Sequence, residues 1–341
     1  MKADSSTIVR HLIPNRTPVR EQASAYAPAN IALCKYWGKR NEALKLPLTG
    51  SLSVSLGALG THMRIQVADG DHFTLYGKRQ TPDSPAYKRL FEFIDLFRES
   101  GTGLDIESHN TIPMGAGLAS SAGAFAAAVL ALNELYAWDL DQKQLSICAR
   151  LGSGSACRSV APGFMEWLPG EREDGLDSYA VPLTLDWPEF RIGILTLSKK
   201  EKAVSSGEGM TRTLRTSSLY ASWPDQVARD LPRIREAVQN RDLIQLGEAA
   251  EQNALSMHAT MISAWPPLLY WQPESVQALH QVHALRSQGL SVYATMDAGP
   301  NVKLLFHRDQ QQDVTKHFPH LTVVDPFVGS AGFANAETDP V

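Results

Sequence analysis

The stretch from Asn110 to Phe125 constrains the fold most, because it has the pattern of a strand, a glycine-rich turn and a helix. Apolar and polar residues alternate from Leu104 to His109, which is the period of a β-strand. Pro113 and Gly115 then interrupt regular structure, and an alanine-rich, strongly helical run continues to Tyr136. Such a turn offers free N–H groups and the positive end of a helix dipole, which bind phosphate. The alternative is close packing of a buried helix, since short glycine motifs often bind nothing.

Composition describes an ordinary globular protein, with 341 residues, 43% hydrophobic and 20% charged residues, and a net charge of −4. This charge gives no reason to expect nucleic acid or an anionic membrane as a partner, so any anion site must be a local cluster. No apolar run approaches the length of a membrane span. Residues 1–22 are polar and lack the apolar core of a signal peptide, so we expect a poorly ordered extension on a cytoplasmic protein.

The chain alternates strand and helix patterns without an internal repeat, which predicts an α+β fold in two domains with a boundary near residue 188. We expect strands at 24–31, where Pro28 would break the strand, and at 52–56, 63–67, 73–75, 104–108, 163–167, 191–197, 292–296, 302–306 and 321–324. We expect helices at 87–98, 121–136, 142–150, 231–238, 243–254 and 275–287. A serine- and glycine-rich loop is expected at 205–209.

A cluster of cations follows the first expected strand. Lys35, Lys39 and Arg40 lie within six residues and are interleaved with Tyr36 and Trp37. The cluster could bind a multiply charged anion, or it could be a surface segment whose aromatic rings pack inward.

Two further segments carry candidate chemistry. A second glycine- and serine-rich turn at 151–159 contains Arg158, and Cys157 beside it is either an activated thiol or a small buried residue. Asp297 follows a strand and precedes Ala-Gly-Pro, which suits either a turn former or a carboxylate that faces a ligand. If Asp297 lies near Lys35, the charge pair lowers its pKa and keeps it ionised.

Several common motifs are excluded. The chain has no P-loop, no third glycine for a dinucleotide-binding turn and no G-x-S-x-G elbow. His280 and His283 lack an evident third metal ligand, and the three cysteines form no CxxC pair, so we expect neither a zinc site nor a disulfide framework.

Four separated segments together resemble one family. The segment 110–121 resembles a phosphate-binding motif of the GHMP kinases. Residues 27–40, 117–121, 152–158 and 296–301 resemble, in this order, the diphosphomevalonate decarboxylases of that superfamily. The resemblance implies an N-terminal ATP-binding α+β domain (residues 23–188), a C-terminal ferredoxin-like α+β domain (189–341) and an active site in the cleft between them.

The resemblance also implies a reaction. Family members use ATP to phosphorylate the 3-hydroxyl of mevalonate 5-diphosphate, which then loses phosphate and CO2 to give isopentenyl diphosphate. By this resemblance, Asp297 is the catalytic carboxylate. It either accepts the proton of the 3-hydroxyl as a base or only orients this hydroxyl. Lys35 pairs with Asp297 or stabilises the transferring phosphoryl group. Arg158 holds the substrate carboxylate with its bidentate guanidinium.

The remaining site residues are carried over from the same motifs. For the substrate they are Asn30, Tyr36, Trp37, Gly38, Lys39, Ser153, Gly154, Ser155, Ala156, Cys157 and Arg158, together with Lys88 or, alternatively, Arg89. For ATP they are Gly115, Ala116, Gly117, Leu118, Ala119, Ser120 and Ser121. Mg2+ is implied by the nucleotide chemistry, with ligands that the sequence does not identify. The family resemblance also implies a homodimer.

Two departures from the family pattern leave specificity open. Thr49-Gly50 stands where the family more often has Asn-Ser, and Gly207 stands where a threonine often contacts the substrate. The alternatives are therefore a decarboxylase of mevalonate 5-monophosphate or of a 3-phosphorylated form, and a GHMP kinase that only phosphorylates. A non-catalytic anion-binding protein is a third possibility, against which the joint presence of Lys35, Arg158 and Asp297 argues.

Overall fold

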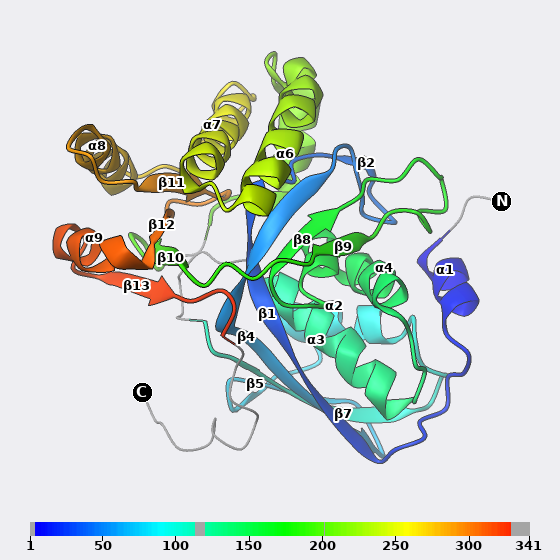
Figure 1. Cartoon of the computed structure of the whole chain (residues 1–341). Coiled ribbons are helices and arrows are strands. Elements are labelled where there is room, and N and C mark those ends of the chain that lie inside the picture. The colour runs from blue at the N-terminus through cyan, green and yellow to red at the C-terminus, as the bar shows by residue number, and fades with distance from the viewer. Residues whose placement is uncertain (1–3, 113–119, 201, 329–341) are drawn as a thin grey trace.

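The computed structural model describes residues 4–112, 120–200 and 202–328 (Figure 1). Its helices are α1 (Ser5–Leu12), α2 (Pro85–Ile94), α3 (Ser120–Leu135), α4 (Gln142–Gly152), α5 (Ser206–Thr216), α6 (Trp223–Asn240), α7 (Leu243–Ile262), α8 (Pro273–Ser287), α9 (Gln311–His317) and the short 3-10 helices η1 (Gly154–Arg158), η2 (Tyr220–Ser222) and η3 (Arg308–Gln310). Its strands are β1 (Gln22–Cys34), β2 (Lys39–Asn41), β3 (Leu46–Pro47), β4 (Ser51–Ala68), β5 (His72–Leu75), β6 (Lys78–Arg79), β7 (Gly103–Asn110), β8 (Phe164–Trp167), β9 (Ala180–Leu183), β10 (Phe190–Leu195), β11 (Tyr293–Met296), β12 (Val302–His307) and β13 (Leu321–Val324).

The first sheet is built around the two long strands β1 and β4. The strand order is β6-β5-β7-β4-β8-β9, and β1 also pairs antiparallel with β4 along its length. The first residues of β4 pair with β8, while its later residues pair with β7. Helix α3 packs on β1 and β4, and α4 packs on α3. The strands β1 and β4 also contact α6, and β1 contacts α7, so both strands lie next to the second domain (Figure 1).

The second sheet has the order β11-β12-β10-β13, with antiparallel neighbours throughout. Helices α7 and α8 contact β11, and α6 packs against α7 (Figure 1). The two domains are mixed α+β units, so the predicted fold class is confirmed.

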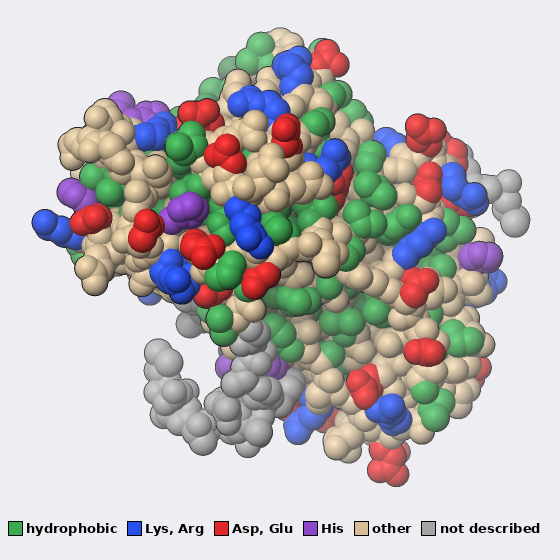
Figure 2. All heavy atoms as spheres, in the orientation of Figure 1, with side chains coloured by type: hydrophobic (Ala, Val, Ile, Leu, Met, Phe, Trp, Pro, Cys, Tyr) green, Lys and Arg blue, Asp and Glu red, His purple; other side chains and the backbone are tan. Residues whose placement is uncertain are grey.

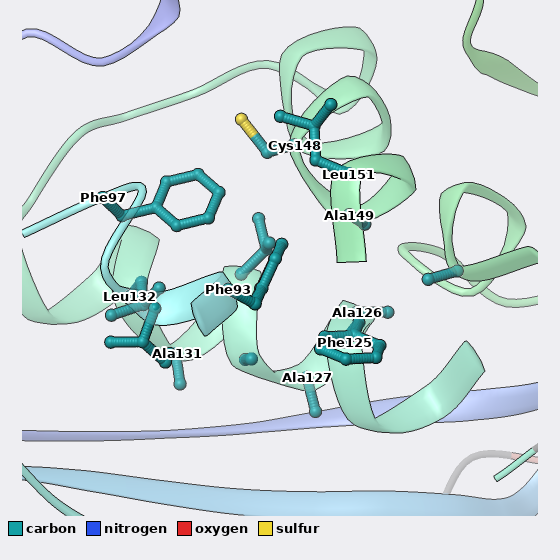
Figure 3. Close-up of a cluster of buried hydrophobic side chains, with 14 of the residues drawn as sticks. Phe93, Phe97, Phe125, Ala126, Ala127, Ala131, Leu132, Cys148, Ala149 and Leu151 are labelled. Carbon is teal, nitrogen blue, oxygen red and sulfur yellow. The ribbon is translucent and has the colours of Figure 1, made fainter. Parts of the chain in front are cut away.

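The described residues form three apolar cores, and one of them joins the two domains. The first core lies inside the N-terminal domain, where Phe93 of α2 packs edge-on against Phe125 of α3 with ring centroids 4.9 Å apart (Figure 3). The second core joins residues of both domains, including Ile31 and Val54 from the first sheet and Ile194 from the second. Helices α6 and α7 both contact β1. Residues at the junction of the two domains are therefore supported by a shared apolar core.

The expectation of a poorly ordered N-terminal extension is wrong for the residues that the structure describes. Helix α1 begins after Asp4, whose carboxylate accepts a hydrogen bond from the Thr7 N–H. Ile8 and Val9 are buried in the first core, next to α4. The sequence signal was weak because the helix has only eight residues, which is too short for an apolar pattern to stand out.

Several boundaries also differ from the sequence prediction. Pro28 does not end its strand. It lies at a register shift in β1, and such irregularities in a strand accommodate proline. The two strands expected at 52–56 and 63–67 form one strand, β4, which continues through Gly57 and Gly60. The expected loop at 205–209 is instead the start of α5, capped by the Ser205 hydroxyl.

Charges of both signs are mixed on the face of the molecule that Figure 2 shows. Neither sign forms a continuous patch on this face. Among the helices of the described residues, none is long and apolar enough to cross a membrane.

Candidate active site

A cavity of about 410 Å³ lies where the two domains meet. The N-terminal domain lines it with β1 and the segment after it, the β2–β3 hairpin, α2, α3, Ser153 and η1. The C-terminal domain lines it with the start of α5, with α7 and with the segment after β11. The lining residues are Asn30, Ala32, Lys35, Tyr36, Trp37, Lys39, Lys45, Arg89, Ser121, Ser153, Gly154, Ser155, Arg158, Ser205, Ser206, Gly207, Met210, Met257, Asp297 and Ala298.

Asp297 is held between two buried lysines. The Lys35 ammonium donates to Asp297 Oδ1 at 2.9 Å, and Lys303 Nζ lies 3.2 Å from Oδ2. Both lysine side chains are 2% exposed, while the Asp297 side chain keeps 30% exposure toward the cavity. Lys35 follows directly after β1, Asp297 directly after β11, and Lys303 is in β12. The cluster therefore forms only when the two domains pack together.

The charges of this cluster keep the carboxylate ionised. Burial alone would raise the pKa of Asp297, but the ammonium groups of Lys35 and Lys303 outweigh it and hold that pKa below its ordinary value. Burial lowers the pKa of Lys35, and attraction to Asp297 opposes this shift. Asp297 is consequently a hydrogen-bond acceptor with a low affinity for protons.

Polar side chains of α7 make hydrogen bonds to the backbone of Lys35 and Asp297. Asn253 accepts a hydrogen bond from the Lys35 N–H at 2.8 Å and donates to Asp230 at 2.8 Å. His258 Nε2 lies 3.1 Å from the Asp297 carbonyl oxygen. Burial, followed by repulsion from Lys35, lowers the pKa of His258 to about 3, so this imidazole is neutral near pH 7.

Arg158 is a buried residue that also lines the cavity, and the described side chains accept hydrogen bonds from only some of its guanidinium N–H groups. Its guanidinium donates to the Ser51 hydroxyl and, at 3.4 Å, to the Asn30 side-chain oxygen. Its carbon Cζ lies 5.7 Å from the ring centre of Trp167. Its Nε has no hydrogen-bond partner among the described residues. A buried guanidinium that reaches a cavity with free donors is suited to a planar anion such as a carboxylate.

Hydroxyl groups gather at the end of α4. Ser153 Oγ lies 3.4 Å from both Ser121 Oγ and Ser155 Oγ. Tyr36 packs against Gly154, where an added Cβ would lie 2.8 Å from the phenol oxygen, so glycine is required at this position. The cluster adjoins the start of α3, where a helix dipole favours anions.

Three further cations, Lys39, Lys45 and Arg89, line another part of the cavity wall and are less buried than Lys35. Lys39 pairs with Glu42 at 2.9 Å, and Glu42 also accepts a hydrogen bond from Thr211 of α5 at 2.8 Å. Lys45 and Arg89 line the same cavity and contact no carboxylate within 4.0 Å among the described residues. This part of the cavity wall thus carries an excess of positive charge.

The family comparisons agree with this geometry. Residues 27–180 match the profile of the diphosphomevalonate decarboxylase-like N-terminal domain, and residues 192–331 match that of the mevalonate 5-diphosphate decarboxylase C-terminal domain. The diphosphomevalonate decarboxylase of Aspergillus fumigatus is 38% identical over 319 residues, which cover 86% of this chain and 78% of the relative. The chain belongs to the diphosphomevalonate decarboxylase family. The resemblance predicted from the sequence is therefore confirmed.

Solved structures of diphosphomevalonate decarboxylases have the same fold. Mevalonate diphosphate decarboxylase from Staphylococcus aureus matches with a TM-score of 0.85 and 35% identity, over 91% of this chain and 97% of that one. A structure of MDDEF in complex with MVAPP, AMPPCP and magnesium matches with a TM-score of 0.83 and 39% identity, over 89% of this chain and 95% of that one.

Most of the residues carried over from the family resemblance meet in the cavity. Asn30, Lys35, Tyr36, Trp37, Lys39, Ser121, Ser153, Gly154, Ser155, Arg158 and Asp297 all line it. Gly38 lies behind this lining, where Tyr220 donates to the Trp37 carbonyl and leaves no space for a Cβ. Ala156 and Cys157 are fully buried. Gly115, Ala116, Gly117, Leu118 and Ala119 lie outside the described residues, and Ser120 begins α3.

Two of the sequence interpretations can be decided. Lys88 does not reach the cavity, because it lies on the outer side of α2 and pairs with Asp83 at 3.6 Å; Arg89, the alternative, lines the cavity. Burial raises the pKa of the Cys157 thiol to about 12, so it is a small buried residue and not an activated thiol.

Lys303, Lys45 and His258 were not identified from the sequence. Lys303 had a usable signal, since a lone lysine in the apolar strand 302–306 must be paired when buried. Lys45 lies in a hairpin turn, where a lysine is unremarkable. The place of His258 depends on how α7 packs.

Proposed function

We propose that this protein uses ATP to convert mevalonate 5-diphosphate to isopentenyl diphosphate, with release of ADP, phosphate and CO2. The observation that carries the proposal is the Asp297 carboxylate, held by Lys35 and Lys303 in the cavity that Arg158 also lines. Family membership sets the reaction class, and the cavity supplies groups for both of its steps.

In the first step, the substrate 3-hydroxyl attacks the γ-phosphorus of ATP and ADP leaves. Asp297 accepts a hydrogen bond from the hydroxyl and aligns its oxygen for in-line attack. Its low pKa makes it a weak base, so orientation is its main contribution. The hydroxyl proton passes to the Asp297 carboxylate late, once the oxygen–phosphorus bond has formed, and from there to solvent. Lys35 keeps the carboxylate in place and neutralises charge on the transferring group.

In the second step, the C3–O bond breaks and inorganic phosphate leaves with the bonding electron pair. The C1–C2 bond electrons then form the C2–C3 double bond, and CO2 is released. Arg158 holds the carboxylate through its guanidinium, so the C1–C2 bond stays aligned with the breaking C3–O bond. The guanidinium is buried and fixed by Ser51 and Asn30, which makes it a rigid holder.

ATP would lie at the Ser121 side of the cavity. A second cavity of about 200 Å³ adjoins it, and Arg89 and Ser121 line both. The second cavity is mainly apolar, with Met63, Phe73, Leu75, Leu90 and Phe125 in its wall and Asn110 as a polar group. It suits a nucleotide base, with the phosphates reaching toward Ser121 and Ser153.

The described residues suit a metal that is carried by phosphates. No group of three or more His, Cys, Asp or Glu side chains within the described ranges is arranged as a metal site. Mg2+ usually binds through substrate phosphates with few protein ligands, and the hydroxyls of Ser121 and Ser153 offer oxygen donors. Magnesium bound with ATP would neutralise charge on the phosphates during transfer. The related structure with MVAPP, AMPPCP (an ATP analogue) and magnesium supports this assignment.

The cations Lys39 and Arg89 would bind the 5-diphosphate, with Ser153 and Ser155 as hydroxyl donors. This replaces Lys88 by Arg89 in the substrate site. We also propose a cytoplasmic location and, from the family resemblance, a homodimer.

The direct test is to incubate the purified protein with Mg-ATP and mevalonate 5-diphosphate and to measure ADP, inorganic phosphate and CO2. We expect all three products in equal amounts. ADP without phosphate or CO2 would reject decarboxylation and leave a kinase. Turnover of mevalonate 5-monophosphate alone would reject the proposed substrate.

A further inference from the structure

Lys45 is a cation of the cavity for which the structure shows no charge partner. Its ammonium donates to the Leu151 carbonyl at 2.6 Å. An ammonium has three N–H donors, and Leu151 is the one acceptor that the described residues provide. Lys45 lines the cavity between the two domains, so its remaining donors are available to a ligand there.

The position of Lys45 is fixed by its hairpin. Leu44, the residue before it, is fully buried in the N-terminal core. The Lys45 backbone is left-handed, with φ of 52°, a conformation that is unfavourable for a residue with a side chain. Unfavourable backbone conformations of this kind persist where surrounding structure imposes them and are common at ligand sites.

Like charges surround this ammonium. Burial lowers the pKa of Lys45, and repulsion from Lys39 and Arg89 lowers it further. The carboxylate of Glu42 attracts Lys45 less strongly than these two cations repel it, and it is engaged by Lys39 and Thr211. Three cations that converge with so little negative charge are stabilised when a multiply charged anion binds among them.

We infer that Lys45 binds the terminal phosphate of the substrate 5-diphosphate and so contributes to the choice of a diphosphate over a monophosphate. The inference rests on the proposed function. The cations that act on Lys45 are Lys39 and Arg89, to which the proposed function assigns the 5-diphosphate. A phosphate of ATP has the same chemistry, so the experiment must separate the two sources.

The structural alternative is that Lys45 only satisfies the last turn of α4. A lysine at a helix C-terminus stabilises free carbonyls and the helix dipole. This role predicts a loss of stability in variants without any loss of substrate affinity, so the two interpretations differ in a measurable way.

Lys45→Gln is the most informative variant, because glutamine keeps a donor for Leu151 and removes the charge. Lys45→Arg keeps the charge, and Lys143→Met removes one exposed lysine from α4 as a matched control. The KM for mevalonate 5-diphosphate, the KM for ATP and thermal unfolding are measured for each. Binding of inorganic diphosphate is measured by calorimetry.

We expect Lys45→Gln to weaken binding of mevalonate 5-diphosphate and inorganic diphosphate about tenfold, the loss typical of one charge-assisted hydrogen bond. The KM for ATP should change by less than about twofold, and mevalonate 5-monophosphate should lose less affinity than the diphosphate. Lys45→Arg should retain most of the affinity, and Lys143→Met all of it.

Three results would overturn the inference: a rise in the KM for ATP alone, affinities equal to those of Lys143→Met, or a lower melting temperature with unchanged affinities. If Lys45→Gln does not fold, Lys45→Met is measured by the same criteria, and the failure of both to fold assigns Lys45 to structure alone. Wild-type protein that does not turn over mevalonate 5-diphosphate would reject the proposed function. Calorimetry with inorganic diphosphate still decides whether Lys45 binds such an anion.

Discussion

Two groups of charges, named by their burial, differ in how their cations are paired. They are the inner end, formed by Lys35, Lys303 and Asp297, and the outer end, formed by Lys39, Lys45 and Arg89. At the inner end, Lys35 and Lys303 are buried and both contact the Asp297 carboxylate. At the outer end, Lys45 and Arg89 contact no carboxylate among the described residues. Both inner cations contact a carboxylate before any ligand binds, whereas Lys45 and Arg89 gain a charge partner only when an anion binds.

This difference separates positioning from binding. Buried charges are costly to desolvate and are tolerated when they are paired, and the pairing then holds them in one geometry. Partly exposed cations without partners are better placed to bind a ligand, since they need not break an ion pair first. Variants of the inner end should therefore lower kcat. Variants of the outer end should raise the KM for the substrate.

The largest effect is expected for Asp297→Asn. Removing the oriented acceptor should lower kcat by on the order of a thousandfold. It also leaves two buried ammonium groups uncompensated. The loss of unfolding free energy should stay below the roughly 3–5 kcal/mol of a fully buried pair, because the carboxylate is 30% exposed. Initial rates of ADP formation and chemical unfolding measure both; a kcat within tenfold of wild type would contradict the role of Asp297.

A smaller effect is expected for Arg158→Gln. The variant loses a charge-assisted contact with the substrate carboxylate, so kcat/KM should fall by about 10- to 100-fold while the affinity for ATP stays within about twofold. CO2 should also be released more slowly than ADP, since the carboxylate is no longer held. Equal loss of ATP affinity and turnover, with CO2 and ADP still formed together, would remove the assignment.

Lys303→Met should shift the pH dependence of activity. Asp297 has a lowered pKa in the folded protein, so its ionised form is stabilising above its ordinary value of 3.8, and this contribution is lost as the pH falls through the folded pKa. Without Lys303 the folded pKa rises, and the acid limb of kcat/KM and of stability should move to higher pH. An acid limb that coincides with wild type would show that Lys303 has only a packing role.

The smallest effect is expected for Glu42→Gln, at the outer end. The variant releases Lys39 from a surface ion pair, so the KM for mevalonate 5-diphosphate should fall by about twofold or less. Glu236→Gln removes an exposed carboxylate from α6 and is the matched control. A marked rise in KM would mean that Glu42 positions Lys39 for the ligand.

Much of the inner end could be predicted from the sequence, for an identifiable reason. Lys35, Arg158 and Asp297 each stand within a short segment that resembles the family, and four such segments in order are specific. What the residues alone could not provide was their distance, because Lys35 and Asp297 are 262 positions apart and meet through the packing of two domains.

The outer end was harder to predict because its residues have no local signature. Lys88 and Arg89 are neighbours on a helix, and a helix turns about 100° per residue, so one faces the cavity and the other faces solvent. Choosing between them requires the phase of α2 relative to its core. The N-terminal helix was missed for a similar reason, since Ile8 and Val9 become significant only once α4 packs beside them.

The division of the cavity can be tested most directly by measuring CO2 release from mevalonate 5-diphosphate over a full range of substrate concentration, for Lys35→Met and Lys39→Met in parallel. Both variants remove one lysine from the same cavity. We predict that Lys39→Met approaches the wild-type rate at saturating substrate, whereas Lys35→Met remains slow at every concentration. The same loss of maximal rate in both variants would contradict the distinction between a positioning end and a binding end.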